Sequence, residues 1–206
     1  MIQPLFLIRH APVTIDLTVP SEQWQLSAEG RALAERIAAL PILRDLRTVW
    51  SSPEPKAQAT ARPLAARHAA ALVIQPDLAE LRRGPANLPD RAAYDAAVRA
   101  AFARPDRSIS GWEPARDARR RIVGCVRAVA AQASGPIAVV SHGLVLSLLL
   151  AHLRGQDRVD VAEWRSIPLP ALAIVDSLTW KIIAPFHPVT AWEQDESPLL
   201  GAKPSA

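Results

Sequence analysis

Residues 5–11 read Leu-Phe-Leu-Ile-Arg-His-Ala, an unbroken apolar run that ends in a cation and an imidazole. Such a run near the start of the chain predicts a strand buried on both faces, as in the parallel sheets of α/β proteins. Ligands of open α/β sheets bind beyond the carboxyl ends of the strands. Arg9 and His10 are therefore expected at the rim of the sheet, where chemistry takes place.

Strand and helix patterns alternate along most of the chain. Further strands are predicted at 47–52, 72–75, 136–141, 171–176 and 178–184, and helices at 27–40, 54–70, 92–102, 111–133 and 144–153. Ser27 can cap the first helix and Pro41 ends it, whereas Pro63 is expected to kink or divide the second. The last two strands are expected to form a hairpin at one edge. This order predicts a three-layer α/β/α sandwich around a mostly parallel central sheet with an antiparallel edge strand.

The length of 206 residues suits one domain. Residues 1–185 are assigned to it. Within this domain the stretch at about 77–112 loses its apolar pattern and accumulates Pro and Arg, so it is expected to cross the rim of the sheet as a cap. Residues 186–206 are Pro-rich and polar and are expected to form a C-terminal tail.

The composition favours a globular protein that binds small anions. The chain is 50% hydrophobic and 21% charged, with a formal net charge of +4. This excess is modest, and the aromatic residues are not interleaved with a basic stripe, so no nucleic-acid partner is expected. No membrane partner is expected either, because the longest apolar segment, 144–153, is too short to cross a bilayer and no secretory signal is apparent. Cys125 is the one cysteine, which excludes an intramolecular disulfide and favours a reducing cytoplasm.

A second histidine follows the strand at 136–141, where the chain reads Ser141-His142-Gly143. If this strand and the first are neighbours in a parallel sheet, His10 and His142 meet above the same edge. His142 also opens a helix, whose free backbone amides and dipole suit a phosphate or another oxyanion. The guanidinium fork of Arg9 matches phosphoryl oxygens.

These residues resemble the motifs of the histidine phosphatase superfamily, the phosphoglycerate mutase-like enzymes. Arg9-His10-Ala11 is similar to the family's Arg-His-Gly signature, and Ser141-His142-Gly143 to its second-histidine motif. Ser51-Ser52-Pro53 with Lys56, Ala57, Thr60 and Ala61 resembles the segment that delivers a second arginine to the phosphate, and Leu78-Ala79-Glu80 the one that carries the acidic residue. The motifs occur in the family's order over roughly the first 150 residues.

The resemblance implies a phosphatase that needs no metal or other cofactor and acts on a small phosphorylated metabolite. His10 would attack phosphorus and form a phosphohistidine, which water then hydrolyses. Arg9, Lys56, His142 and Gly143 would hold the phosphoryl oxygens. Glu80 would protonate the leaving oxygen and later activate the water.

Two departures from the family pattern leave alternatives open. Ala11 stands where the family has glycine, and Lys56 where it has arginine, which removes the planar fork and its extra donors. A catalytically weak phosphate-binding or regulatory module is therefore the alternative to the enzyme. A mutase is disfavoured because the chain is shorter than typical cofactor-dependent mutases. A basic nucleic-acid-binding domain has only the charge and the arginine-rich helix in its favour.

The substrate beyond its phosphate is expected to meet the segment at 77–112. Arg82, Arg83 and Trp112 are candidate contacts, although arginines in loops are commonly solvent-exposed. His68 and His152 lie late in helices, where a structural role is expected, and His187 is expected to be exposed. The C-terminal hairpin is either covered or the edge through which a homodimer forms.

Overall fold

The computed structural model describes residues 2–84 and 88–193. Its strands are β1 (Pro4–Arg9), β2 (Thr48–Ser51), β3 (Ala71–Ile74), β4 (Ile137–Ser141), β5 (Ala171–Asp176) and β6 (Ile182–Pro188), which form one sheet in the order β3-β2-β4-β1-β5-β6. β3, β2, β4 and β1 run parallel to one another, and β5 runs antiparallel to both β1 and β6. The predicted sheet, mostly parallel with an antiparallel hairpin on one edge, is confirmed.

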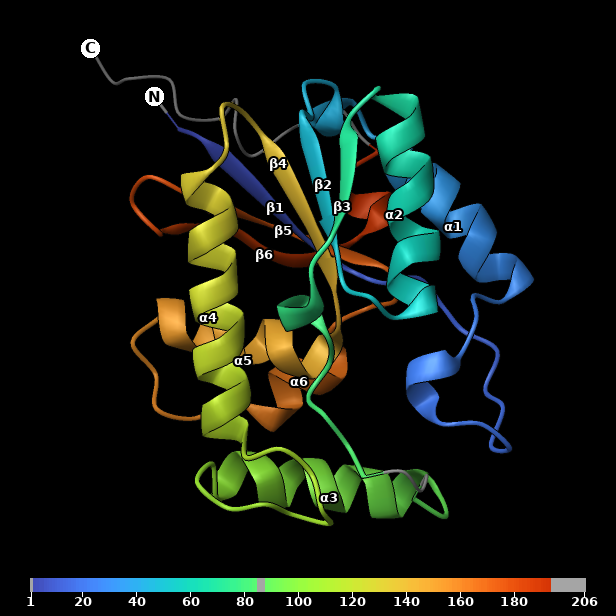
Figure 1. Cartoon of the computed structure of the whole chain (residues 1–206), viewed down its shortest axis with the longest axis vertical. Helices are drawn as coiled ribbons and strands as arrows, with labels where there is room; N and C mark the ends of the chain where they lie inside the picture. Colours follow the sequence, from blue (N-terminus) through green and yellow to red (C-terminus); the bar gives the residue numbers. More distant parts are fainter. Residues whose placement is uncertain (1, 85–87, 194–206) are drawn as a thin grey trace.

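Helices cover both faces of this sheet, so the predicted three-layer sandwich is confirmed as well. The helices are α1 (Ala28–Ala38), α2 (Pro55–Arg67), α3 (Arg91–Ala103), α4 (Ala115–Ala131), α5 (Gly143–Leu153) and α6 (Val161–Ser166), with 3-10 turns at Ser21–Gln23, Pro41–Leu43, Pro76–Leu78 and Val189–Ala191. α1 and α2 lie on one face, α4 and α5 on the other, and α3 crosses beyond the carboxyl ends of the parallel strands (Figure 1).

The apolar run of β1 serves two cores at once. Leu5 and Leu7 pack in the core formed with α4 and α5, whereas Phe6 and Ile8 pack in the core formed with α1 and α2. All four side chains are at most 1% exposed. An alternating strand would leave one face to water, so the unbroken run is what a central strand between two helix layers requires.

The first helix begins as the sequence predicts. The Ser27 hydroxyl accepts a hydrogen bond from the Gly30 N–H at 2.9 Å and caps α1. A Cβ on Gly30 would lie 2.0 Å from the Pro12 carbonyl oxygen, so only glycine allows α1 to approach the loop that follows His10.

Two expectations about the elements are corrected. α2 is not divided: Pro63 lies inside a helix that runs without interruption. The second strand of the hairpin begins at Ile182 rather than 178, because the Asp176 side chain accepts bonds from the Leu178 N–H and the Thr179 hydroxyl and builds a turn there. β6 then continues to Pro188, so residues 186–188 belong to the sheet and not to the expected tail. The tail's residues from 194 lie outside the described chain.

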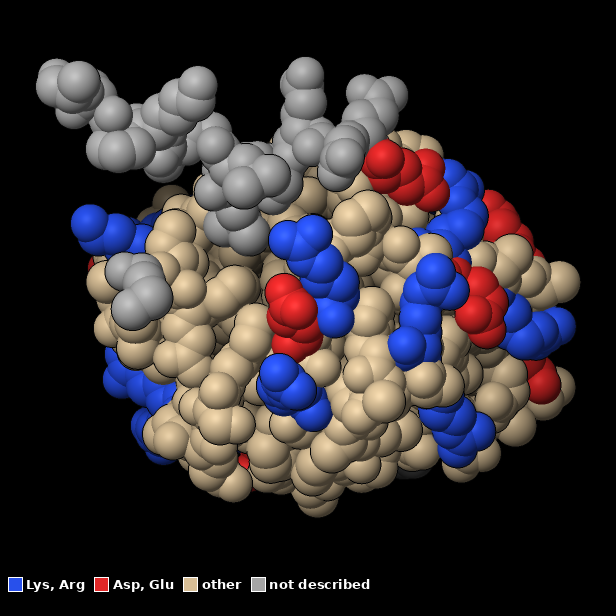
Figure 2. Space-filling model, turned by 90° about the horizontal axis from the view of Figure 1, so that it is seen from above, with Lys and Arg blue, Asp and Glu red and all other residues tan. Residues whose placement is uncertain are grey.

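The amino ends of the parallel strands form a face of mixed charge. In Figure 2, which looks onto this face, acidic and basic side chains lie interspersed between wide areas of other residues. Among the described residues, no helix combines the length and the apolar character needed to cross a bilayer.

Candidate active site

The two histidines meet at the carboxyl edge of the sheet. β1 and β4 are adjacent and parallel, with Arg9 paired to Ser141, so His10 and His142 each follow the end of a strand at the same level. The ring centroids are 5.2 Å apart, and the backbone N–H of His10 donates to the backbone carbonyl of Ser141 at 3.0 Å. The strand order thus produces the juxtaposition that the sequence suggested.

His10 is held as a neutral imidazole with one nitrogen free. Its Nδ1 lies 2.8 Å from the Ala11 carbonyl oxygen, which can only accept, so the proton is on Nδ1 and the lone pair is on Nε2. Burial lowers the pKa of His10 well below 6.5, and the nearby His142, Lys56 and Arg9 lower it further. An uncharged Nε2 with an available lone pair is the form that attacks an electrophile.

His142 is fully buried at the N-cap of α5. Its Nε2 lies 2.7 Å from the Ser52 hydroxyl, which follows β2, and 3.3 Å from Oε1 of Glu54. Burial lowers the pKa of His142 well below 6.5, and the charges of Lys56 and Arg83 act in the same direction. Its Nδ1 is buried and has no hydrogen-bond partner within the described chain.

Arg9 places its guanidinium against the start of α5. A Cβ on Gly143 would lie 3.0 Å from both Cζ and Nε of Arg9, so glycine gives the guanidinium its place beside the backbone. Nη1 donates to the Ile167 carbonyl, whereas the buried Nε has no partner among the described residues. Arg9 and Gly143, both predicted to hold phosphate, therefore lie together beside the histidines.

Lys56 is bound by a carboxylate that the sequence reading did not single out. Its side chain is 4% exposed, and Nζ lies 2.6 Å from Oε2 of Glu54 and 2.6 Å from the Ser21 carbonyl oxygen. Glu54 precedes Pro55, the first residue of α2, and the same carboxylate accepts from the Glu80 N–H at 2.8 Å. The only sequence signal was an acidic residue directly before a helix, which is common at helix starts.

The amides at the start of α5, expected to be free for a phosphate, are occupied by Glu80. The carboxylate accepts from the N–H groups of Leu144 and Val145, at 3.1 and 3.0 Å, and from that of Leu81 at 2.9 Å. The positive end of the helix dipole favours any anion, and a carboxylate of the chain itself competes there with a ligand. Glu80 is thus brought to the site, but as an anchor on α5.

The three candidate substrate contacts have different surroundings. The Arg83 guanidinium lies 5.6 Å from the ring centroid of Tyr94 and 5.9 Å from that of Trp112. Burial alone would lower the pKa of Arg83, but Tyr94 and the carboxylates around the site, Glu80 first among them, raise it overall. Trp112 is only 3% exposed, so its ring contacts the Arg83 guanidinium rather than solvent, whereas Arg82 is exposed.

Arg121 is a second residue that the sequence analysis missed, because no local signal separates it from the exposed arginines beside it in the same helix. Its guanidinium donates to the carbonyls of Asp77, Ala79 and Glu80 and to both carboxylate oxygens of Glu113. It therefore fixes the segment that carries Glu80. Among the described residues, no group of three or more His, Cys, Asp and Glu side chains is placed to hold a metal ion.

The arrangement can bind and attack a phosphoryl group. It combines a free imidazole nitrogen, a second buried imidazole, a guanidinium on a helix start and two carboxylates within one edge of the sheet. Phosphoryl transfer needs little more than such positioning and positive charge around the equatorial oxygens.

Comparison with known proteins places these residues in a family. The model of the histidine phosphatase superfamily (branch 1) matches residues 5–181. No curated protein sequence matches the chain significantly.

Three solved structures illustrate the likeness. A mycobacterial glucosyl-3-phosphoglycerate phosphatase superposes with a TM-score of 0.69 at 21% identity, over 89% of this chain and 98% of its own. A putative α-ribazole-5′-phosphate phosphatase from Escherichia coli K-12 gives 0.70 at 20% identity, over 91% and 97%. The phosphoserine phosphatase of Entamoeba histolytica gives 0.68 at 15% identity, over 89% and 96%. At these identities the likeness establishes the fold.

Proposed function

The chain belongs to the histidine phosphatase superfamily, branch 1, and from this membership we propose that it is a metal-independent phosphomonoesterase that acts through a phosphohistidine on a small phosphorylated metabolite. One observation carries the proposal: Nδ1 of His10 donates to the Ala11 carbonyl, so a neutral imidazole presents its Nε2 lone pair at the carboxyl edge of the sheet. The names of the three structural neighbours point to the same class, since each of their substrates is a small phosphomonoester.

In the first step, Nε2 of His10 forms a bond to phosphorus while the ester P–O bond breaks. The charge on the equatorial oxygens is stabilised by Arg9, by Lys56 and by the one N–H that the neutral imidazole of His142 carries. In the second step, a water oxygen attacks phosphorus, the P–N bond breaks, and inorganic phosphate leaves. The lowered pKa of His10 keeps the nucleophile neutral at pH values below 6.5.

We assign the proton on the leaving oxygen to Glu80, which then accepts the proton of the attacking water. Glu54 is the competing carboxylate, favoured by its position 3.3 Å from Nε2 of His142. The two roles separate by substitution. Glu80→Gln slows the release of alkyl alcohols far more than that of nitrophenol, which leaves without a proton, whereas the same selectivity in Glu54→Gln would assign the acid to Glu54.

The alternative, a phosphate-binding module with weak or no catalysis, is favoured by one contact. Because Glu54 pairs with Lys56 at 2.6 Å, the second cation of the phosphate site is already compensated. A bound phosphoryl group would have to compete with this carboxylate. Weakened transition-state stabilisation is the consequence that would turn an enzyme of this fold into a binding protein.

Direct detection of the intermediate distinguishes the two. The protein is mixed with a panel of phosphomonoesters in the presence of EDTA, quenched in base, and tested for protein-bound phosphate that is stable in base and released by acid. Turnover with such a phosphoenzyme is expected. His10→Ala should lose both, with a fall in kcat of at least about 1,000-fold.

The matched control is His187→Ala, which removes an exposed histidine of β6 and should leave turnover unchanged. Phosphate binding without turnover or phosphoenzyme on any ester would establish the binding module instead. Turnover that EDTA abolishes would refute the metal-independent mechanism.

A further inference from the structure

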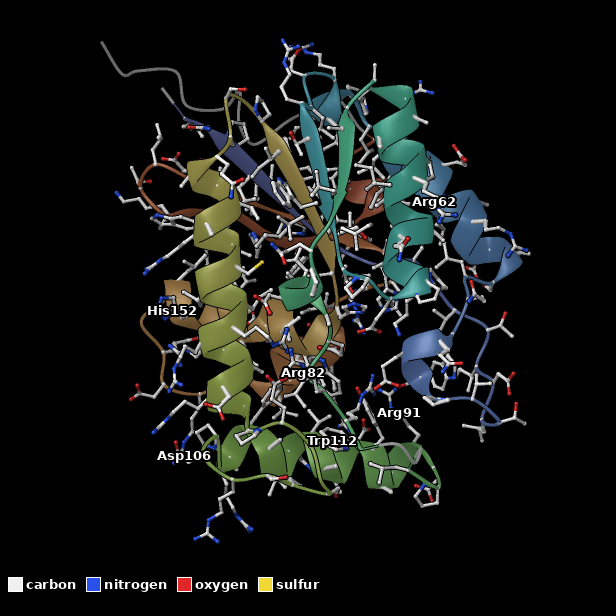
Figure 3. All side chains as sticks on the ribbon, viewed as in Figure 1. Arg62, Arg82, Arg91, Asp106, Trp112 and His152 are labelled. Atoms are coloured by element: carbon white, nitrogen blue, oxygen red, sulfur yellow. The ribbon has the colours of Figure 1, made fainter. Side chains whose placement is uncertain are left out.

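A cavity of about 630 Å³ lies on the other side of α4 from the candidate active site around His10 and His142. Its wall is built from four parts of the chain: the end of α3 with the turn that follows, the first turns of α4, the second half of α5, and the loop before α6. Asp106 and His152, which line it, lie on one side of α4 in Figure 3, while Arg91 and Trp112 lie on the other.

The lining is strongly cationic. Five arginines contribute to it, against the two aspartates Asp106 and Asp157, and they come from separate elements: Arg104 and Arg107, Arg116 and Arg119, and Arg158. Arg116 and Arg119 are three residues apart and so project from the same side of α4. Arg119 is half-buried and the other four arginines are exposed, so like charges gather around one hollow that is open to an anion from solvent.

Most of this charge is not compensated by the chain. Arg116 pairs with Asp106 at 2.5 Å, and Arg119 donates to the Asp157 carbonyl at 3.2 Å. The side chains of Arg104, Arg107 and Arg158 have no ion pair or hydrogen bond with any described residue. The positive charge also acts on His152, which lines the cavity: burial lowers the pKa of His152, and Arg119 and Arg127 lower it further.

The floor of the cavity is apolar. It is formed by Phe102, Ala115 and Leu148, each at most 4% exposed. A hollow of this size, with an apolar floor and a few convergent polar groups, is typical of sites for small molecules, which measure roughly 300 to 1,000 Å³. A nucleic acid or a membrane would instead require an extended basic surface.

We propose that this cavity binds a small soluble molecule that carries two or more phosphate groups. One phosphate bridges the arginines of the turn after α3, another those of α4, and Arg158 closes the site from the loop before α6. Guanidinium forks donate bidentately to phosphate oxygens, which suits arginines that have no partner in the chain.

The cavity is separate from the candidate active site. None of the catalytic or phosphate-binding candidates lines it. His142 caps the start of α5 and His152 lies in its last turn, so the helix separates the two by about 15 Å at about 1.5 Å per residue. Binding at this site is therefore measurable whether or not the protein is a phosphatase.

Calorimetric titration with tripolyphosphate at physiological salt tests the proposal on four proteins. The wild type is expected to bind, and the double variant Arg107→Gln/Arg158→Gln to bind at least about tenfold more weakly. The double variant Arg62→Gln/Arg67→Gln removes the same charge from exposed positions of α2 and should bind within about twofold of the wild type. Arg9→Gln removes any phosphate binding at the candidate active site and should retain the binding that Arg107→Gln/Arg158→Gln weakens.

Several results would overturn the proposal. No binding by the wild type up to about 1 mM would remove the site. A loss of binding in Arg9→Gln alone would place the ligand at the candidate active site. An equal loss in the α2 control would reduce the effect to overall charge. A single-stranded decanucleotide that binds more tightly than tripolyphosphate through the same arginines would make the ligand a nucleic acid. Arg104→Gln provides a second cavity variant should the double variant unfold.

Discussion

Arg9 and Gly143 are coupled across two strand ends. The guanidinium of Arg9 extends from the end of β1 to the backbone of Gly143, the first residue of α5. It also donates to the carbonyl of Ile167, which follows α6. Its Nε remains without a partner among the described residues. A ligand bound between His10 and the start of α5 can therefore use a donor whose position depends on the absence of a single methyl group.

Gly143→Ala tests this coupling. A Cβ would stand 3.0 Å from Cζ and Nε of Arg9, so the guanidinium must move by a few tenths of an ångström. We expect a fall in kcat/KM of about tenfold or more toward a phosphomonoester with a change in unfolding free energy below about 1 kcal/mol, because misplacing a positioning group costs rate more than stability.

The matched control is Gly124→Ala in α4, where an added Cβ meets no atom within 4 Å. It should leave kcat/KM unchanged and stabilise the protein by about 0.5–1 kcal/mol, since alanine is the better helix residue. Steady-state kinetics and urea unfolding measure both variants. Equal kinetics in Gly143→Ala and the wild type would show that Arg9 does not need its observed position.

At the scale of elements, α4 holds the segment that carries Glu80. Arg121, on α4, donates to the carbonyls of Asp77, Ala79 and Glu80 in that segment and to the Glu113 carboxylate, and its side chain is 8% exposed. Glu80 in turn binds the first amides of α5. A chain of polar contacts thus runs from one helix through the loop to the start of another, and the geometry of the candidate site depends on it.

Arg121→Met is expected to destabilise the protein by about 3 kcal/mol, because it leaves the Glu113 carboxylate and three carbonyls without their buried partner. Arg120→Met, one residue away, removes an exposed pair with Asp117 at 3.5 Å and should cost less than about 0.5 kcal/mol. Urea unfolding of both variants measures the difference. Similar costs for the two would show that the loop does not rely on Arg121.

At the scale of the whole molecule, the packing of two helix layers on the sheet buries both catalytic histidine candidates, His10 and His142. His10 is 8% exposed and His142 is not exposed at all, although each lies at a strand end. Folding therefore removes two imidazoles from water, next to Arg9 and Lys56. Their charged forms are disfavoured in the folded state, and global stability becomes a function of pH.

The sign follows from the two pKa values. Both lie well below 6.5 in the folded protein, so at pH values under 6.5 the unfolded chain binds more protons than the folded one. The contribution of the two neutral histidines to the free energy of unfolding is therefore fully present above about pH 6.5. It falls as the pH is lowered, by up to about 1.4 kcal/mol per pH unit for each histidine. Urea unfolding at pH 7.5, 6.5 and 5.5 measures the slope before the carboxylates titrate. His10→Gln should reduce the slope of the unfolding free energy against pH by about the contribution of one histidine. An unfolding free energy that is independent of pH over this range would refute the burial of the two imidazoles.

Local patterning was sufficient for the strands and helices, whereas the meeting of the histidines was predicted only on the condition that the first and fourth strands are neighbours. The run in β1, the Ser27 cap and the strand at 136–141 depend on residues near each other in the chain, and parallel strands bring their carboxyl ends to one edge whatever the loops do. The tertiary structure met the remaining condition by placing β1 beside β4, so that His10 and His142 lie together although 132 positions separate them (142 − 10).

The charge pairing inside the site followed instead from contacts between distant segments. Glu54 contacts His142, Glu80 accepts from the first amides of α5, and Arg121 donates to carbonyls of the segment that carries Glu80. Helical or strand periodicity carries no information about which carboxylate reaches which buried cation. That choice depends on how two helix layers and a rim segment pack, because burial makes each charge take the partner that the fold brings within hydrogen-bond distance.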